Sequence, residues 1–338
     1  MGGGDRYAYK LALALRPYGD ITFFTFGPRY REESLDGLAH VVLPALRGNP
    51  DNPVPRSVTF TSRRFDIVHT YHLRTAVTSL ATIVRAALRR PLVVTDLGGG
   101  GRSVTMRLRL YRLVKRFISI SEFSRGLLPP DVRSRAIVIK GGIDPARFAF
   151  DPRPRDRQVL QVSRLMPHKG QNYLIDAAGK DIAVVIAGKI VAPAYYRDLE
   201  KRAQGKPVRF LIDADDDEIL AEYQRSRVTV QASVYRDMYG GYWPTSELLG
   251  LPLLESMSVG TPVICTNVGG MPEFVRDGAT GFVIPPNDPA ALRGRLDELL
   301  GDPARASGMG AAGHEHAQQF TWDAVARQVS AEYARLLG

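Results

Sequence analysis

Two successive series of short apolar runs, separated by helix-period segments, constrain the fold of this chain more than any other feature. Short runs rich in Val, Ile, Phe and Thr predict β-strands. The first series lies at residues 20–27, 65–71, 91–96, 116–121 and 136–142, and the second at 158–164, 182–188, 208–213, 228–233, 262–266 and 281–286. Strand–helix alternation is typical of parallel sheets covered on both faces. The chain is therefore predicted to be α/β, with two Rossmann-like, doubly wound domains facing across a cleft.

The segment 148–157 separates the two series and has the proline and charge content of a connector. We therefore predict an N-terminal domain over residues 1–150, a C-terminal domain over 151–320 and a final segment over 321–338. A length of 338 residues with 44% hydrophobic residues is enough for two cores. Ligands of doubly wound sheets bind beyond the carboxyl ends of the strands, so we expect the site at strand-to-helix turns.

The N-terminus reads as a glycine turn, a helix and then the strand at 20–27, without the strand that normally feeds such a turn. In a doubly wound sheet this first strand is central, and omitting it leaves buried backbone groups without partners. We therefore expect the natural protein to begin upstream of Met1. Gly2, Gly3 and Gly4 then fit a flexible tail, a plain helix entry or a turn that a phosphate or sugar approaches closely, and a dinucleotide site is a weaker interpretation.

The single cysteine, Cys265, lies in an apolar run. It is predicted to be a buried strand residue in a reducing compartment rather than half of a disulfide. The N-terminus lacks a charged leader followed by an apolar core, and the chain has no stretch of about 18 uninterrupted apolar residues. We therefore expect a cytoplasmic protein.

The excess positive charge is confined to the N-terminal half. Residues 1–150 hold 24 Lys and Arg against 11 Asp and Glu, whereas residues 151–338 hold 21 against 24. Helical spacing over 107–117 would place three apolar side chains on one face and three arginines on another, namely Leu108, Tyr111 and Val114, and Arg109, Arg112 and Arg116. Such a face suits an anionic membrane surface, which would make the protein peripheral at the inner face of the membrane, or an acidic acceptor. An ordinary solvated face fits equally well, and nucleic acid is not expected because no aromatic platform or binding motif accompanies the charge.

Two glutamates, Glu247 and Glu255, flank a break in the chain. Pro252 suits the first turn of a helix, which is predicted over 252–259 with Glu255 in its first turn and Glu247 in the preceding loop. The free N–H groups of this helix form an anion site, and Gly250 removes a side chain where a ligand needs close approach. Carboxylates accept hydrogen bonds from sugar hydroxyls, so a nucleotide sugar fits. Alternatively, Glu255 complements the helix dipole and Glu247 is solvated.

A second group of charges lies at residues 162–170. Arg164 ends a predicted strand, Lys169 begins the next helix, and Gly170 allows close approach. Two cations beside a helix N-terminus stabilise the negative charge that develops on a leaving diphosphate when no metal is supplied. Alone, both residues would be ordinary surface charges, but together with the glutamates they indicate a site.

Several motifs together resemble the family 4 retaining glycosyltransferases, the glycosyl transferases group 1, which have the GT-B fold. The C-terminal half carries SRL and KG within 163–170, an E-x7-E pattern at 247–255, and the segments 269–292 and 320–337. The N-terminal half matches more loosely, at 2–15, 65–72, 119–125 and 141–148. The resemblance covers nearly the whole C-terminal half.

The resemblance implies transfer of a sugar, with retention of configuration, from a UDP-, GDP-, ADP- or dTDP-sugar to a saccharide, lipid-linked or small-molecule acceptor. It implies no essential metal and no other cofactor. The C-terminal domain would hold the donor, the N-terminal domain the acceptor, and the final helix would cross back onto the N-terminal domain. The implied roles are the donor diphosphate for Arg164, Lys169 and the backbone of Gly250 and Leu251, the ribose for Glu255, and the transferred sugar, at the catalytic centre, for Glu247.

The loop at 95–103 departs from the family pattern, because many relatives carry a histidine near the position of Leu97. Other candidate contacts to sugar or acceptor are Gly3, Gly4, His72, Asp96, Arg102, Tyr242 and Trp243. The two aromatic residues among them could stack on an acceptor sugar or pack against their own loop. No histidine cluster predicts a metal site, and the acidic segment 213–218 is predicted to cap a helix.

A catalytically silent sugar-nucleotide-binding protein of the same fold is the alternative function. The presence of both glutamates and both cations of the motif, Glu247, Glu255, Arg164 and Lys169, favours an active enzyme.

Overall fold

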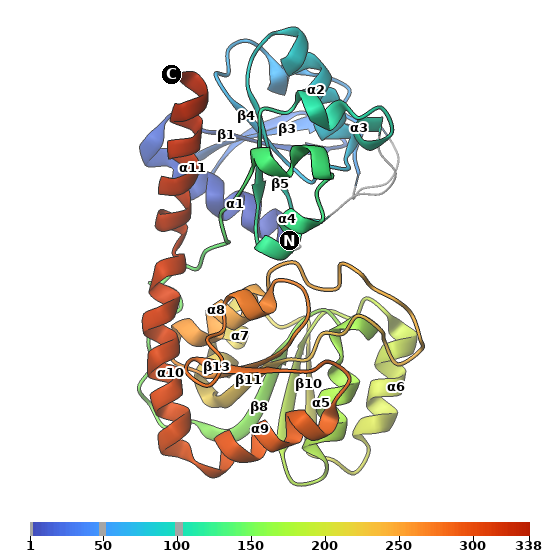
Figure 1. Ribbon diagram of the computed structural model, residues 1–338, viewed down its shortest axis with the longest axis vertical. Coiled ribbons are helices and arrows are strands. Elements are labelled where there is room, and N and C mark those ends of the chain that lie inside the picture. Colours follow the sequence, from blue (N-terminus) through green and yellow to red (C-terminus); the bar gives the residue numbers. More distant parts are fainter. Residues whose placement is uncertain (1–2, 47–51, 99–103) are drawn as a thin grey trace. The chain divides into compact units, whose positions relative to one another are not determined.

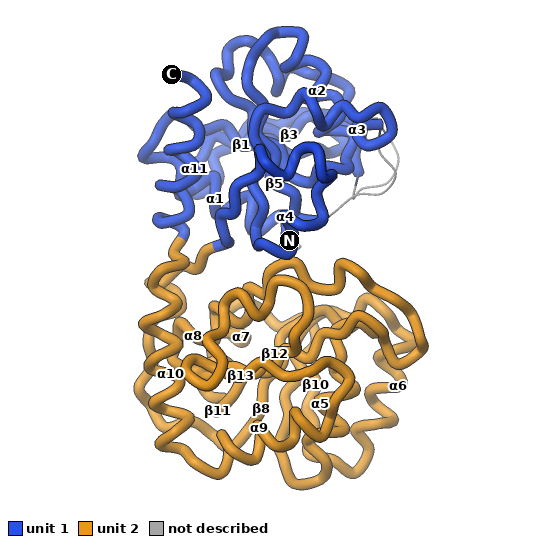
Figure 2. Tube along the Cα trace, in the orientation of Figure 1, with its two compact units in different colours: residues 1–141, 322–338 blue, residues 142–321 orange. Residues whose placement is uncertain are grey.

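The computed structural model describes residues 3–46, 52–98 and 104–338, and the chain divides into two compact units (Figure 2). Unit 1 comprises Met1–Gly141 and Trp322–Gly338, and unit 2 comprises Gly142–Thr321. The division falls after Gly141 rather than after residue 150. Residues 142–150 belong to unit 2 because Ile143 N–H donates to the Phe320 carbonyl oxygen (2.8 Å) and Ser258 Oγ donates to that of Phe148 (2.6 Å).

Unit 2 is built on one six-stranded parallel sheet with strand order β10-β9-β8-β11-β12-β13 (Figure 1). The strands are β8 (Asp156–Val162), β9 (Ala183–Gly188), β10 (Val208–Ile212), β11 (Ser226–Gln231), β12 (Val263–Thr266) and β13 (Gly281–Ile284). The helices are α5 (Gln171–Ala178), α6 (Pro193–Ala203), α7 (Asp216–Arg225), α8 (Leu251–Ser258), α9 (Pro289–Gly301) and α10 (Pro303–Ala317). Each of the six runs predicted in this half of the sequence forms a strand.

Alternate residues of the unit 2 strands enter two different cores. Val159 and Val184 lie in the larger cluster, with Leu174 of α5 and Leu296 of α9. Leu160 and Val185 lie in the other cluster, with Tyr223 of α7. Burial on both faces explains why these strands are continuous apolar runs in the sequence. Cys265 of β12 is fully buried, as predicted, and burial raises the pKa of its thiol.

Unit 1 contains two sheets. The first has the parallel order β4-β5-β6-β7, from β4 (Val68–Tyr71), β5 (Leu92–Asp96), β6 (Arg116–Ser119) and β7 (Ala136–Val138). The second has the order β1-β3-β2, from β1 (Thr22–Gly27), β2 (Arg31–Leu35) and β3 (Leu38–Pro44). The helices are α1 (Gly3–Leu15), α2 (Ala76–Ala87), α3 (Val104–Arg107), α4 (Glu122–Gly126) and α11 (Trp322–Leu337).

Both sheets of unit 1 cover one apolar cluster, which includes Leu43 of β3 and Leu92 of β5. Within the described residues, β1 pairs only with β3 and β4 only with β5, so each has one edge without a partner strand. The first described element is α1, and it leads through one 3-10 turn directly into β1.

The hairpin of β2 and β3 was not predicted. Its turn is formed by Asp36 and Gly37, both with positive φ (51° and 75°), as in the two-residue turns that join antiparallel strands. The Asp-Gly pair is a recognised hairpin signal, but β2 is a polar, mostly exposed edge strand that carries no apolar run.

The predicted helical face over 107–117 is wrong. Helix α3 ends at Arg107, Arg109 adopts a left-handed conformation (φ 52°), and a short 3-10 helix follows over Leu110–Leu113. Strand β6 then begins at Arg116. The helix is interrupted because Val114 and Phe117 are both drawn into the core beneath the sheet.

Candidate functional site

The turn after β8 brings a lysine to the carboxyl end of the unit 2 sheet. A 3-10 helix (Pro167–Lys169) leads to Gly170, whose φ is +68°. A Cβ on Gly170 would lie 1.9 Å from the carbonyl oxygen of Ala232, just beyond β11. Only glycine therefore allows this turn to lie against the end of β11, so the backbone of Ala232 by itself accounts for a glycine here. Lys169 is 9% exposed, whereas the Arg164 side chain is exposed and forms no ion pair with any residue that the structure describes.

Lys169 and Glu247 form an ion pair between Nζ and Oε2, although they are 78 positions apart. Both side chains are largely buried, at 11% and 17% exposure. The Glu247 carbonyl oxygen accepts the N–H of Gly270 (3.2 Å), and a Cβ on Gly269 would lie 1.6 Å from the same oxygen. The glutamate is therefore fixed at both its backbone and its carboxylate.

Helix α8 begins one residue earlier than predicted, at Leu251. Gly250 is its N-cap, with φ +92°, and a Cβ there would lie 2.9 Å from the Met271 side chain. Glu255 is accordingly the fifth residue of α8 and not in its first turn, because Leu251 rather than Pro252 opens the helix. Its carboxylate accepts a hydrogen bond from the Tyr223 hydroxyl (2.9 Å).

Tyr223 is a site residue that the sequence analysis missed. It is fully buried on α7 and packs edge-on against Phe148 (6.3 Å between ring centroids). The helix that carries it begins at a capping box, in which Asp215 accepts the N–H of Glu218 (2.8 Å) and the Glu218 carboxylate accepts that of Asp215 (2.9 Å). This confirms that the acidic segment 213–218 caps a helix.

The segment 235–246, hereafter the aromatic loop, contains Tyr242 and Trp243. The Trp243 ring packs on His168, with 4.5 Å between centroids, and its Nε1 donates to Asp237 Oδ2 (2.7 Å). Tyr242 is 63% exposed, with the Arg236 guanidinium 5.4 Å from its ring centroid. Of the two alternatives for Trp243, the structure therefore supports packing, whereas the Tyr242 ring presents an exposed surface.

Unit 1 gathers three of the predicted sugar or acceptor contacts. His72 follows β4 with a positive φ of 65°, and its ring lies over Gly4, where a Cβ would approach within 3.2 Å. Asp96 ends the adjacent strand β5, and its Oδ1 accepts the N–H groups of Leu73 (3.2 Å) and Gly98 (3.3 Å). Burial lowers the pKa of His72. Gly3 opens α1, and Arg102 lies outside the described residues.

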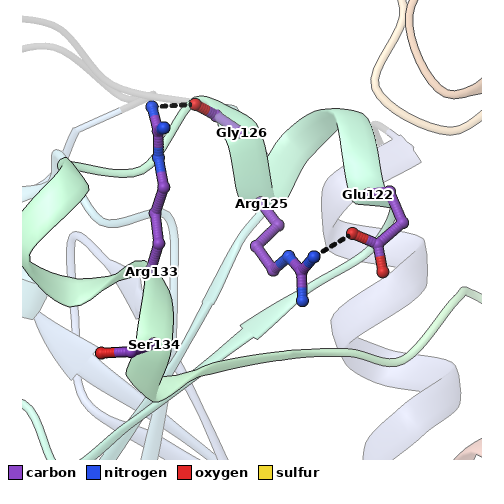
Figure 3. Close-up of a pocket in the computed structure, with 5 residues that line it drawn as sticks. All are labelled: Glu122, Arg125, Gly126, Arg133 and Ser134. Atoms are coloured by element: carbon purple, nitrogen blue, oxygen red, sulfur yellow. Dashed lines mark hydrogen bonds and ion pairs between the residues drawn. The ribbon is translucent and has the colours of Figure 1, made fainter.

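A surface pocket of unit 1 lies between α4 and the 3-10 helix Pro130–Arg135 (Figure 3). Its two arginines are already engaged. Arg125 pairs with Glu122 (2.7 Å), and Arg133 donates to the carbonyl oxygens of Leu128 (2.9 Å) and Gly126 (2.5 Å). The pocket therefore offers a ligand less unpaired charge than the end of the unit 2 sheet.

No group of three or more His, Cys, Asp or Glu side chains is arranged to hold a metal ion within residues 3–46, 52–98 and 104–338. Over the same ranges, every helix is too short or too polar to cross a bilayer.

Comparison with curated proteins identifies relatives that are named as glycosyltransferases. The chain is 32% identical over 189 residues to a D-inositol 3-phosphate glycosyltransferase of Corynebacterium efficiens, which covers 52% of this chain and 42% of that protein. It is also 32% identical over 262 residues to a GDP-mannose-dependent alpha-(1-6)-phosphatidylinositol monomannoside mannosyltransferase of Mycolicibacterium smegmatis, covering 71% and 62%. The chain thus spans less than two thirds of the length of these relatives.

Solved structures match over nearly the whole chain. HepE of Anabaena, in complex with UDP and glucose, superimposes with a TM-score of 0.78 at 20% identity, covering 99% of this chain and 96% of that one. Sucrose-phosphate synthase of Thermosynechococcus elongatus gives 0.76 at 22% identity, covering 99% and 94%. At this identity the matches show the fold, which is GT-B, with two α/β units as predicted.

Two family profiles divide the sequence between them. The profile described as Glycosyltransferase Family 4 matches residues 1–147, and the profile described as Glycosyl transferases group 1 matches residues 143–316. The second match covers half of the chain and contains the paired Lys169 and Glu247. The chain therefore belongs to the glycosyl transferases group 1 family.

Proposed function

We propose that this chain is a metal-independent, retaining glycosyltransferase that moves a sugar from a nucleotide diphosphate to an acceptor hydroxyl. One observation carries the proposal: unit 2 holds Lys169 and Glu247 in contact beside the N-terminus of α8. A cation, an anion-binding helix start and a hydroxyl-accepting carboxylate are the groups that a nucleotide sugar requires. Unit 2 would be the donor domain and unit 1 the acceptor domain.

The ion pair suggests how the donor enters. Lys169 and the exposed Arg164 would neutralise the diphosphate, with the backbone of Gly250 and Leu251 at the start of α8. The arriving diphosphate competes for the Lys169 ammonium and releases the Glu247 carboxylate. That carboxylate then accepts hydrogen bonds from hydroxyls of the transferred sugar, while Glu255, steadied by Tyr223, accepts those of the ribose.

The proposed reaction is a front-face displacement. The bond between the anomeric carbon and the β-phosphate oxygen breaks, and a bond from the acceptor oxygen to that carbon forms on the same face. The acceptor proton passes to the departing β-phosphate oxygen. Arg164 and Lys169 stabilise the charge that develops on this oxygen. They would thereby take the role that a metal ion has in metal-dependent transfer.

For the acceptor we propose a saccharide, a lipid-linked saccharide or a small polyol. The names of the relatives support this range, because they include enzymes named for inositol 3-phosphate and phosphatidylinositol monomannoside and a glycogen synthase of Mycobacterium tuberculosis. Within unit 1, the junction of His72, Asp96 and the start of α1 is the proposed contact, since a left-handed non-glycine residue often marks a functional site. The exposed Tyr242 ring of unit 2 is a further candidate.

A lipid-linked acceptor would bring the protein to a membrane, and a surface of unit 1 suits that partner. Three exposed apolar side chains, Val104, Leu108 and Leu113, lie in one segment with the exposed cations Arg107, Arg109 and Lys115, whereas Arg112 of the same segment pairs with Asp131 (2.6 Å). We propose that this surface rests peripherally on anionic lipid at the inner face of the membrane. Co-sedimentation should increase with the anionic fraction of the liposomes, and equal recovery on neutral liposomes would contradict it.

The alternative, a silent sugar-nucleotide-binding protein, makes a different prediction. We expect one of UDP-, GDP-, ADP- and dTDP-sugars to raise the melting temperature, and the protein then to transfer that sugar with retention, as read from the anomeric proton couplings of the product. Stabilisation by a donor with neither transfer nor hydrolysis would favour the binding protein. Inversion of the anomeric centre would contradict the mechanism.

A further inference from the structure

The aromatic loop is folded around one buried carboxylate. Asp237 is 8% exposed, and its Oδ1 accepts the N–H groups of Tyr239 and Gly241, both at 2.9 Å. Its Oδ2 accepts Trp243 Nε1 at 2.7 Å. Trp243 also donates its backbone N–H to the Tyr235 carbonyl oxygen (2.7 Å). The indole is therefore held in one orientation by both its backbone and its ring nitrogen.

The indole packs on a histidine that has an unsatisfied nitrogen. His168 is 5% exposed, and its Nδ1 is buried without a hydrogen-bond partner among the described residues. A buried polar atom without a partner costs about 1–3 kcal/mol. The Trp243 ring packs on the His168 ring, at 4.5 Å between centroids and an interplanar angle of 33°, and so restrains its position.

The same turn is tied to both ends of the aromatic loop through its backbone. The His168 carbonyl oxygen accepts Val234 N–H (2.8 Å) and Ser246 Oγ (3.3 Å). The next carbonyl oxygen, that of Lys169, accepts Gln161 Nε2 (2.7 Å). Lys169 directly follows His168, and Glu247 directly follows Ser246. Hydrogen bonds at both ends of the aromatic loop therefore link the backbone next to Lys169 with the backbone next to Glu247.

We propose that Trp243 and His168 are positioning residues for the donor diphosphate, and that the aromatic loop holds Lys169 through their ring packing. The inference rests on the proposed function of Lys169 and Glu247. Its physical basis is preorganisation. A lysine that becomes ordered on binding loses conformational entropy, and a turn that fixes its backbone beforehand reduces this entropic cost. Neither ring needs to contact the donor for this effect.

The test compares alanine and phenylalanine at position 243, with binding of UDP, GDP and ADP measured by isothermal titration calorimetry. For the nucleotide that binds the wild-type protein, Trp243→Ala should raise Kd about tenfold, because the packing on His168 is lost. Trp243→Phe keeps an aromatic face on His168 and should stay within about threefold. The matched control is Tyr239→Phe in the same loop. It removes only the hydrogen bond from the exposed Tyr239 hydroxyl to Asp198 of α6 and should bind like wild type.

A second pair of variants keeps the test decisive if Trp243→Ala fails to fold. His168→Ala should weaken binding as Trp243→Ala does, and His168→Phe should restore it, since the role is packing and not proton transfer. A folded Trp243→Ala with unchanged Kd, or a His168→Phe as impaired as His168→Ala, would overturn the inference while leaving the proposed function intact. Failure of the wild-type protein to bind any of these three nucleotides or dTDP would overturn both.

Discussion

At the scale of single residues, Glu247 is held more firmly than a solvated loop glutamate needs to be. Its carboxylate meets Lys169, and its backbone is fixed by Gly269 and Gly270. This ion pair holds the two side chains in place before the ligand binds, and an incoming ligand can still separate them. The same pair makes the roles of its two members separable by mutation.

Glu247→Gln keeps the size of the side chain and removes its charge. We expect the turnover number to fall about 100-fold or more, because a group placed at the reacting sugar acts mainly on the transition state. Donor affinity should hold or improve, since Lys169 loses its competitor. Steady-state kinetics at saturating donor provide the measurement, with Glu315→Gln on the exposed face of α10 as the control. Unchanged turnover would refute the assigned role.

Arg85 shows a different use of a buried charge. Its side chain is fully buried in unit 1 and donates to main-chain carbonyl oxygens, among them those of Phe65 (2.8 Å), Asp66 (2.6 Å) and Pro91 (3.1 Å). The guanidinium fork thus ties α2 to two chain segments, which no apolar residue can do.

Arg85→Met should lower the free energy of unfolding of unit 1 by about 3 kcal/mol or more, because several buried carbonyl groups lose their donor. Thermal denaturation followed by circular dichroism measures the effect. Arg89→Met is the control, because the Arg89 side chain is exposed and forms no hydrogen bond or ion pair with the described residues; it should melt within about 2 °C of wild type. Equal melting of both variants would show that the carbonyl groups find other donors.

At the scale of secondary-structure elements, the C-terminal helix α11 is fastened to unit 1 by buried aromatic and polar contacts. Tyr333 Oη lies 2.6 Å from His69 Nδ1, and His69 Nε2 lies 2.7 Å from Thr95 Oγ1. Trp322 packs edge-on against Tyr7 of α1 (5.2 Å). Helices α1 and α11 lie side by side (Figure 1).

This fastening should depend on pH. Burial lowers the pKa of His69 to about 3, whereas an unfolded histidine titrates near pH 6.5. The neutral ring therefore contributes its full stability above pH 6.5, and this is lost as pH falls toward 3, at about 1.4 kcal/mol per pH unit. Wild type should lose roughly 2 kcal/mol more than His69→Gln between pH 7.5 and 5.0, measured by urea denaturation. Equal losses would contradict the assignment.

Which elements the sequence predicts depends on how they are buried. Strands with both faces covered, such as β9 and β12, are apolar runs and were predicted. The edge strand β2 exposes three consecutive charged residues, Arg31, Glu32 and Glu33, and was missed. The segment 107–117 has helical spacing, yet burial of Val114 and Phe117 on consecutive elements overrides it. Spacing alone carries no information about where tertiary packing interrupts a helix.

The residues of the candidate site also differ in whether the local sequence reveals them. Arg164, Lys169 and Gly250 were proposed because each stands at a strand end or helix start with a residue type that suits an anion or a hydroxyl, and Glu255 was proposed because its helix was expected to begin one residue later. Tyr223 and His168 were missed because an interior aromatic residue and a histidine in a short 3-10 helix have no distinguishing local pattern. Their contacts to Glu255 and Trp243 join segments far apart in the sequence, and only the fold shows them.

At the scale of the whole molecule, the proposed donor groups all lie in unit 2, which has its own two-sided core. Residues 142–321 expressed alone should therefore fold and bind the nucleoside diphosphate within about threefold of the full chain. They should not transfer sugar, because the proposed acceptor contacts at His72, Asp96 and the start of α1 lie in unit 1. A folded fragment that does not bind would place part of the donor site outside unit 2, and an unfolded fragment would show that unit 2 does not fold on its own.

The central claim is that Lys169 receives the donor diphosphate, and one comparison tests it most directly. Lys169→Met removes the ammonium group and keeps most of the side-chain volume. Calorimetric titration should show Kd for the nucleoside diphosphate rising at least tenfold, while that for the matching monophosphate changes less than about threefold, since the lost contact is to the terminal phosphate. An unchanged Kd for the diphosphate in a folded variant would contradict the account.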